Sequence, residues 1–137
     1  SIDWADSRSL VGSDSTGNVY VWDTTSREIV LTFESIEGAV WDLAFSPDGQ
    51  LLAGATDDGK VQVWNAETGD LLRTETFNSV MRSVDWSAQG DLLAFGGVTP
   101  RPGEQVITSE TATSLGPVGF GIIALGSSVP DDPVPLE

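Results

Sequence analysis

The stretch WDLAFSPDGQLLAGATDDGKVQVW, residues 41–64, indicates the fold class because it alternates short apolar runs with sequences typical of tight turns. SPDG at residues 46–49 places Pro at the second position of a type I turn, which its fixed φ suits. TDDGK at residues 56–60 supplies a second tight turn. The apolar runs between the turns span only a few residues each, which is typical of strands and not of helices. The stretch therefore predicts antiparallel strands joined by hairpins.

A third turn, NAETGD at residues 65–70, follows this stretch and leads into a further short apolar run. One copy of the pattern therefore contains four strands. We place them at about residues 40–46, 50–56, 60–65 and 70–77.

The pattern is repeated along the chain. Trp22 precedes Trp64 by 42 positions, and a third copy begins near Ser79 and fades after Gly97. Four strands repeated at about 40 to 45 residues are typical of the blades of a β-propeller. The copies occupy about residues 1–39, 40–78 and 79–126.

Three segments carry a resemblance to a known family: VYVWD at residues 19–23, VQVWN at residues 61–65, and residues 41–64 as a unit. Together they resemble the WD-repeat (WD40) family, and the resemblance extends from residue 1 to about residue 97. It implies an all-β fold of four-stranded antiparallel propeller blades, about three in number, of which the third is degenerate. Residues 1–126 would form a partial propeller, and residues 127–137 a Pro-rich acidic tail.

Three blades make an incomplete ring. Propeller blades bury their faces against two neighbours and close rings of about 4 to 8 blades. Two apolar blade faces would therefore stay open, which a monomer rarely tolerates. We expect further blades from the same longer chain, which is favoured because the sequence begins at Ser1 and not at Met, or from other copies in a homo-oligomer.

The chain departs from the family pattern at its polar residues. Family members often carry a His that joins a hydrogen-bonded set with a Ser or Thr, a turn Asp and the Trp, and this sequence contains no His. Asp58, followed by Gly59, matches the turn Asp. We therefore expect this network to be absent and the blades to depend on packing. The tryptophans at the repeated strand positions are expected in the core; they are Trp4, Trp22, Trp64 and Trp86.

Charge restricts the classes of partner. The 137 residues include 21 acidic and 6 basic residues, for a net charge of −15. Nucleic acids and anionic membranes are poor partners for such a chain, because their binding depends on Lys and Arg. No apolar run reaches the about 18 residues that a membrane span needs. Without a leader or Cys, cytoplasm is the default compartment.

The sequence predicts no catalytic, cofactor or metal site. Neither a Ser-His-Asp nor a Cys-His arrangement is possible without His and Cys, and the usual nitrogen ligands of zinc are missing. The turns SDSTGN and TDDGK contain oxygen ligands but lack the alternating carboxylates of a calcium loop. Asp57 and Asp58 are adjacent on a turn and are not expected to converge on a pocket, as acid-base catalysis requires.

The best candidates for partner contact lie where the fourth strand of one copy leads to the first strand of the next. Trp41 corresponds there to Arg82, with Asp42 and Met81 beside them, although packing inside the ring would explain Trp41 and Arg82 equally well. We expect a noncatalytic protein-interaction scaffold. The alternatives are a propeller domain accessory to an enzyme, and a self-assembling carbohydrate-binding propeller, for which only Trp41 fits the aromatic pattern.

Overall fold

The computed structural model describes residues 1–33, 38–77, 79–98, 112–114 and 120–125, and all regular structure in these ranges is β-strand. No helix in these ranges is long and apolar enough to cross a membrane. The strands are β1 (Ile2–Trp4), β2 (Ser9–Ser13), β3 (Val19–Asp23), β4 (Glu28–Phe33), β5 (Val40–Phe45), β6 (Leu51–Thr56), β7 (Lys60–Asn65), β8 (Leu71–Thr76), β9 (Met81–Trp86), β10 (Leu92–Gly97), β11 (Ala112–Ser114) and β12 (Phe120–Ala124).

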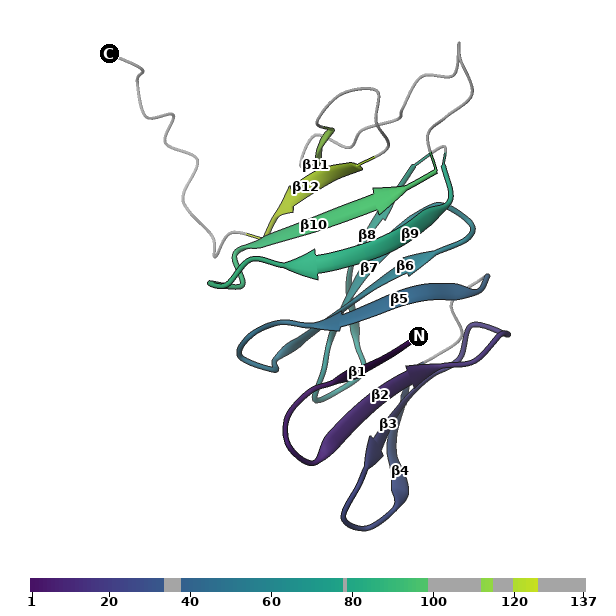
Figure 1. Cartoon of the computed structure of the whole chain (residues 1–137), viewed down its shortest axis with the longest axis vertical. Coiled ribbons are helices and arrows are strands. Elements are labelled where there is room, and N and C mark those ends of the chain that lie inside the picture. The colour runs from purple at the N-terminus through teal and green to yellow at the C-terminus, as the bar shows by residue number, and fades with distance from the viewer. Residues whose placement is uncertain (34–37, 78, 99–111, 115–119, 126–137) are drawn as a thin grey trace.

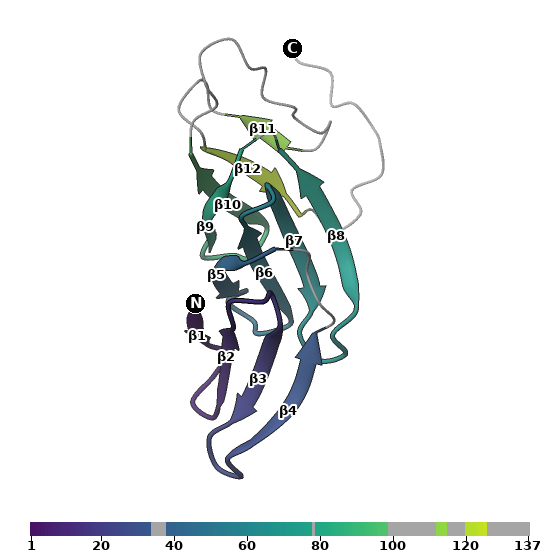
Figure 2. The same cartoon turned by 90° about the vertical axis from the view of Figure 1, so that its right-hand side faces the viewer.

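The strands form three four-stranded antiparallel sheets that lie one above the other (Figure 1). Sheet 1 has the order β1-β2-β3-β4, sheet 2 the order β5-β6-β7-β8, and sheet 3 the order β9-β10-β12-β11. The first strands of the sheets, β1, β5 and β9, run along one side of the stack, and β4 and β8 run along the other side (Figure 2). We call the first set the inner strands. The predicted all-β fold of four-stranded antiparallel sheets is confirmed.

Sheet 2 is the best-preserved copy of the repeat, and its four strands lie where the turn sequences predict them. The SPDG turn shows why. Gly49 adopts φ 72°, and its N–H donates to the Ser46 carbonyl oxygen at 2.8 Å. Asp48 accepts a hydrogen bond from the Ser46 hydroxyl at 2.6 Å. Glycine reaches this left-handed conformation without steric cost, so the chain reverses here and β6 pairs back on β5.

Sheet 3 departs from the order of the other two sheets. β12 pairs with β10 and takes the third position, and β11 pairs with the far edge of β12 although it precedes β12 in the sequence. The predicted tail at 127–137 lies outside the described residues. The copy limits 1–39, 40–78 and 79–126 stay a prediction.

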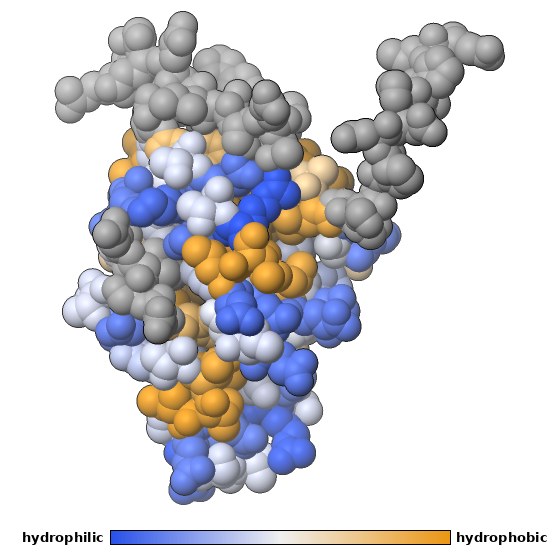
Figure 3. Space-filling view, turned by 180° about the vertical axis from the view of Figure 1, so that it is seen from behind, coloured by the Kyte–Doolittle hydropathy of each residue, from blue (hydrophilic) through white to orange (hydrophobic). Residues whose placement is uncertain are grey.

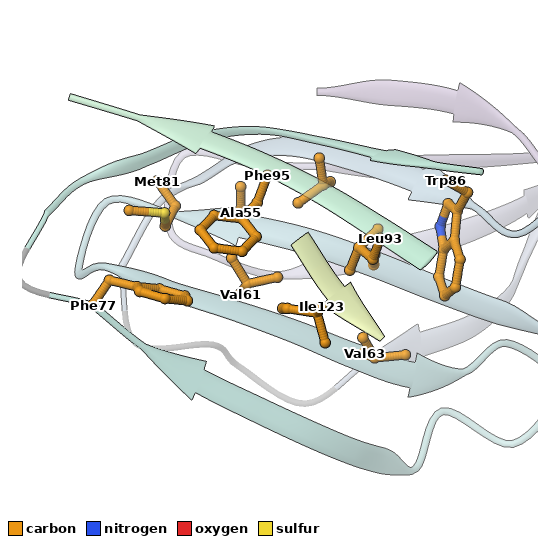
Figure 4. Close-up of a cluster of buried hydrophobic side chains, with 11 residues drawn as sticks. Ala55, Val61, Val63, Phe77, Met81, Trp86, Leu93, Phe95 and Ile123 are labelled. Carbon is orange, nitrogen blue, oxygen red and sulfur yellow. The ribbon is translucent and has the colours of Figure 1, made fainter. Parts of the chain in front are cut away.

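The hydrophobic core lies between the sheets in two layers. Between sheets 1 and 2 the rings of Phe33 and Trp64 meet edge to face, with centroids 5.9 Å apart. Between sheets 2 and 3, Phe77 lies against Phe95 with centroids 4.6 Å apart (Figure 4). Successive residues of a strand point to opposite faces, so sheet 2 supplies both layers. Its residues in the first layer are Val40, Leu43, Leu52 and Trp64, and those in the second are Ala53, Ala55, Val61, Val63 and Phe77.

The expectation that the repeated tryptophans are core residues is correct for two of them and wrong for two. Trp64 and Trp86 are 3% and 9% exposed, whereas Trp4 is 58% and Trp22 40% exposed. The reason is position: among the described residues, no sheet covers the face of sheet 1 that carries Trp4 and Trp22. Apolar residues also gather in separate patches among hydrophilic residues on the side opposite to the view of Figure 1 (Figure 3).

Candidate interaction surface

Trp41 is a large aromatic side chain that the backbone turns outward. In β5, Val40 pairs with Thr56 and Asp42 with Ala55, so Trp41 is an extra residue with no partner opposite it. Such a bulge changes the alternation of the strand and redirects side chains. It explains why Val40 and Leu43, three positions apart, are both buried while Trp41 is 47% exposed.

The same bulge recurs one sheet further on, at Arg82. In β9, Ser83 pairs with Gly96 and Met81 with Gly97, which leaves Arg82 as the extra residue. Arg82 is exposed, and the central carbon of its guanidinium lies 4.0 Å from the centroid of the Trp41 ring. This is a cation–π contact. The structure thus brings Trp41 and Arg82 together on the surface, and we call this pair the Trp41–Arg82 patch.

Met81 and Asp42 do not belong to the exposed patch. Met81 is 2% exposed and packs in the layer between sheets 2 and 3 (Figure 4), and its contact with a partner stays a prediction. Counted back from the buried Val84, strict alternation along β9 would bury Arg82 and expose Met81. The bulge at Arg82 reverses both outcomes.

Asp42 joins neighbouring sheets. Its Oδ2 accepts hydrogen bonds from the main-chain N–H of Val84 at 3.1 Å and from the Ser83 hydroxyl at 3.2 Å, both in β9. Its Oδ1 accepts from the Ser1 hydroxyl at 3.3 Å and from the N–H of Leu43 at 3.1 Å. A half-buried carboxylate engaged by these donors has a structural role, and its contact with a partner stays a prediction.

Asp58 and Gly59 shape the turn between β6 and β7. The Asp58 carboxylate accepts a hydrogen bond from the Thr56 hydroxyl and lies 2.5 Å from Lys60 Nζ. Burial would raise the pKa of Asp58, but the hydrogen bonds from Lys60 and Thr56 and the charge of Lys60 outweigh it, so the pKa is lowered. Gly59 has φ 85°, and a Cβ there would collide with the carbonyl oxygen of Phe77.

Asp14, which the sequence did not predict, is the hydrogen-bond acceptor of the turn between β2 and β3, as Asp58 is in the turn between β6 and β7. It accepts hydrogen bonds from the Thr16 hydroxyl at 2.6 Å, from Asn18 Nδ2 at 3.0 Å and from the Tyr20 hydroxyl at 3.2 Å. The Thr16 and Asn18 bonds lower the pKa of Asp14. In the repeat, Asp14 corresponds to Thr56, and Thr16 stands at the position of Asp58. The Asp-x-Thr-x-Asn spacing, which is typical of a hydrogen-bonded turn, could have identified Asp14 from the sequence.

The acidic turns are thus explained by bonds within each turn. Across the ranges that the structure describes, no group of three or more His, Cys, Asp or Glu residues is arranged to hold a metal ion.

Residues 27–65 match the family model described as "WD domain, G-beta repeat". Eukaryotic translation initiation factor 3 subunit I of Brugia malayi is 33% identical over 75 residues, which are 55% of this chain and 23% of that protein. WD repeat-containing protein 36 of Homo sapiens is 35% identical over 77 residues, 56% of this chain and 9% of that protein. THO complex subunit 3 of Arabidopsis thaliana is 29% identical over 84 residues, 61% of this chain and 27% of that protein.

The chain therefore spans at most 27% of these relatives. Among solved structures, the WD40 β-propeller domain of Doa1 superimposes with a TM-score of 0.68 at 18% identity, covering 90% of this chain and 35% of that one. A chain of the mitotic checkpoint complex superimposes with a TM-score of 0.67 at 28% identity, covering 72% and 31%. The described sheets thus have the architecture of propeller blades.

Proposed function

Because the chain belongs to the WD-repeat family of β-propellers, we propose that it is a noncatalytic scaffold that binds other proteins through the Trp41–Arg82 patch. Two of its relatives carry names of subunits of larger assemblies, translation initiation factor 3 and the THO complex. Their names support protein binding as the general function of this chain. They do not transfer a partner to it, because the chain matches only a small part of each relative.

The exposed cation–π contact of Arg82 with Trp41 carries this proposal. Trp and Arg are the residue types that contribute most to binding energy when a partner excludes water from them. The contact restrains the Arg82 side chain before a partner arrives, which reduces the entropy that binding costs. The guanidinium has five N–H donors, and those that face solvent can donate to a carboxylate. We infer a partner segment that places an apolar group on Trp41 and a carboxylate or carbonyl oxygen beside Arg82.

Two bulges, at Trp41 and at Arg82, support the assignment of this surface. Bulges re-aim side chains, and here both turn a residue outward at the same position of adjacent inner strands. Trp41 and Arg82 lie outside the two core layers, so both side chains are accessible to a partner. Neither an accessory role beside an enzyme nor carbohydrate binding is favoured by a comparable observation.

Photo-crosslinking tests the proposal. A photoreactive phenylalanine analogue replaces Trp41 in one variant and, as the matched control, Val30 in another, because Val30 is an outer-strand bulge residue that is 58% exposed. Irradiation in extract of the source organism should give discrete protein adducts from position 41 and not from position 30. Excess unlabelled wild-type chain should abolish them, and excess Trp41→Ala/Arg82→Ala chain should not. Equal adducts at both positions, or competition by both chains, would refute the assigned surface.

A further inference from the structure

Among the bonds that link the inner strands, those from a main-chain N–H to a side-chain oxygen all run in one direction. Each inner strand offers side-chain oxygens at alternate positions, and the next inner strand donates main-chain N–H groups to them. The three bonds run from Leu43 N to Ser1 Oγ (3.2 Å), from Phe45 N to Asp3 Oδ2 (3.1 Å) and from Val84 N to Asp42 Oδ2 (3.1 Å). The stack thus has an acceptor side and a donor side.

Sheet 3 presents the acceptor side without a following strand among the described residues. In β9, Ser83 holds the repeat position of Ser1 and Asp42, and Asp85 holds that of Asp3. Both residues are exposed. They line a hollow of about 260 Å³ together with Ala94, Gly96 and Ile122.

The floor of this hollow consists of small residues, as the corresponding face of sheet 2 does. Ala94 and Gly96 hold the positions of Ala53 and Ala55. Ala53 and Ala55 are fully buried in the layer that also contains Trp86 of sheet 3. Small residues at these positions leave room for large ones on the neighbouring sheet, so the open face of sheet 3 can receive a sheet that presents large side chains.

Sheet 1 presents the complementary donor side. Ile2 pairs with Gly12 and Trp4 with Leu10, and the same registers join Leu43 to Gly54 and Phe45 to Leu52 in sheet 2. The N–H groups of Ile2 and Trp4 thus hold the positions of the two N–H groups of β5 that donate to β1.

The side chains on this face are also those of an interface. A hollow of about 410 Å³ is lined by residues that include Ile2, Leu10, Gly12 and Trp22. Ile2 is 68% and Trp22 40% exposed, whereas the residues that hold their positions in sheet 2, Leu43 and Trp64, are each 3% exposed because sheet 1 covers them.

We propose that the open face of sheet 1 packs on the open face of sheet 3 of a second copy of this chain, so that two chains close one ring of six sheets. In each junction the Ile2 and Trp4 N–H groups donate to Ser83 and Asp85, and Trp22 packs over Ala94. Six sheets lie within the about 4 to 8 that close a propeller. This inference is independent of the Trp41–Arg82 patch.

A head-to-tail arrangement is favoured over the pairing of like faces. If two copies met through sheet 3, Asp85 would face Asp85 across a partly desolvated junction with side-chain acceptors on both sides and no main-chain donor. If they met through sheet 1, main-chain donors would face main-chain donors. Only the junction of sheet 1 with sheet 3 reproduces the direction of the main-chain N–H bonds to side-chain oxygens.

The net charge of −15 per chain opposes this assembly, and salt should promote it. The Debye length falls from about 10 Å at 0.1 M salt to about 3 Å at 1 M. The apolar contacts are not weakened by this screening, so the dimer fraction should rise with ionic strength.

Light scattering behind size exclusion, with circular dichroism of the same peak, tests the proposal on the full chain. In about 1 M salt, where repulsion is screened, we expect twice the chain mass with a β-type spectrum. A single-chain mass at every salt and protein concentration, or masses that grow beyond two chains, would overturn the closed dimer.

Two variants and their mixture test the direction of packing. Trp22→Asp and Ala94→Lys should each give folded monomers, because both residues are exposed in the single chain. An equal mixture should recover the mass of two chains, since one junction is then intact and the other opposes the two introduced charges. Leu72→Asp, at a 56% exposed outer-strand position, should remain dimeric. Loss of the dimer in only one of the two variants would show that like faces pair, and no recovery on mixing would overturn the head-to-tail junction.

Discussion

Replacing Asp42 should weaken the attachment of sheet 3 to sheet 2. In Asp42→Ala the N–H of Val84 and the hydroxyl of Ser83 lose their charged acceptor. A hydrogen bond to a charged group contributes about 1.5–3 kcal/mol net, and a buried donor left without an acceptor costs about 1–3 kcal/mol. Val84 is buried, whereas Ser83 is exposed and can bond to water. We therefore count one full loss, and expect the free energy of unfolding to fall by about 2–3 kcal/mol.

Urea unfolding followed by tryptophan fluorescence measures this change, at one fixed protein concentration because association adds to apparent stability. Asp42→Asn keeps one acceptor oxygen and should fall between the wild type and Asp42→Ala. Asp70→Ala is the matched control: it removes an exposed turn carboxylate that accepts from the Thr68 hydroxyl, and its effect should stay within about 0.5 kcal/mol. An Asp42→Ala effect no larger than that of Asp70→Ala would refute the structural role of Asp42.

The pKa of Asp58 is lowered on folding, so its stabilising effect is present above the ordinary Asp pKa of about 4 and is lost as the pH falls through the lower folded value. Asp58→Asn should therefore flatten the curve of unfolding free energy against pH in that acid range, and an unchanged curve would contradict this. Gly59→Ala should lower the free energy of unfolding in urea by more than about 1 kcal/mol. Gly12→Ala is the control and should be neutral or stabilising, because its Cβ would lie 3.7 Å from the Ser1 carbonyl oxygen. Equal effects would contradict the turn geometry. Trp64→Ala should cost about 3–5 kcal/mol and Trp22→Ala much less at concentrations where the chain is monomeric, which thermal unfolding can compare.

The turn chemistry made sheet 2 predictable from the sequence. Pro and Gly at defined positions of short turns, between runs of strand length, determine where β5 to β8 begin and end within a residue or so. Repetition then located sheet 1. Sheet 3 was predictable only as far as β10, because the order in which β12 and β11 pair depends on contacts made after a long connection, and no local pattern encodes it.

The site was predictable in residue type and not in orientation. Strand alternation alone left Trp41 and Arg82 equally consistent with core and surface. A one-residue bulge at each of them decides which way its side chain points. The bulge at Arg82 also buries Met81. The exposure of Trp22 could not be predicted from its repeat position either, because burial there depends on whether a neighbouring sheet is present.

Small-angle X-ray scattering in about 1 M salt would show whether the open face of sheet 1 and the open face of sheet 3 form one interface between two chains. It gives both mass and shape in one experiment. A closed pair of chains predicts a mass of two chains and a radius of gyration of about 19 Å, as for a compact protein of that length, both independent of concentration. A mass of one chain, or a radius of gyration that rises with concentration as open stacks lengthen, would contradict it.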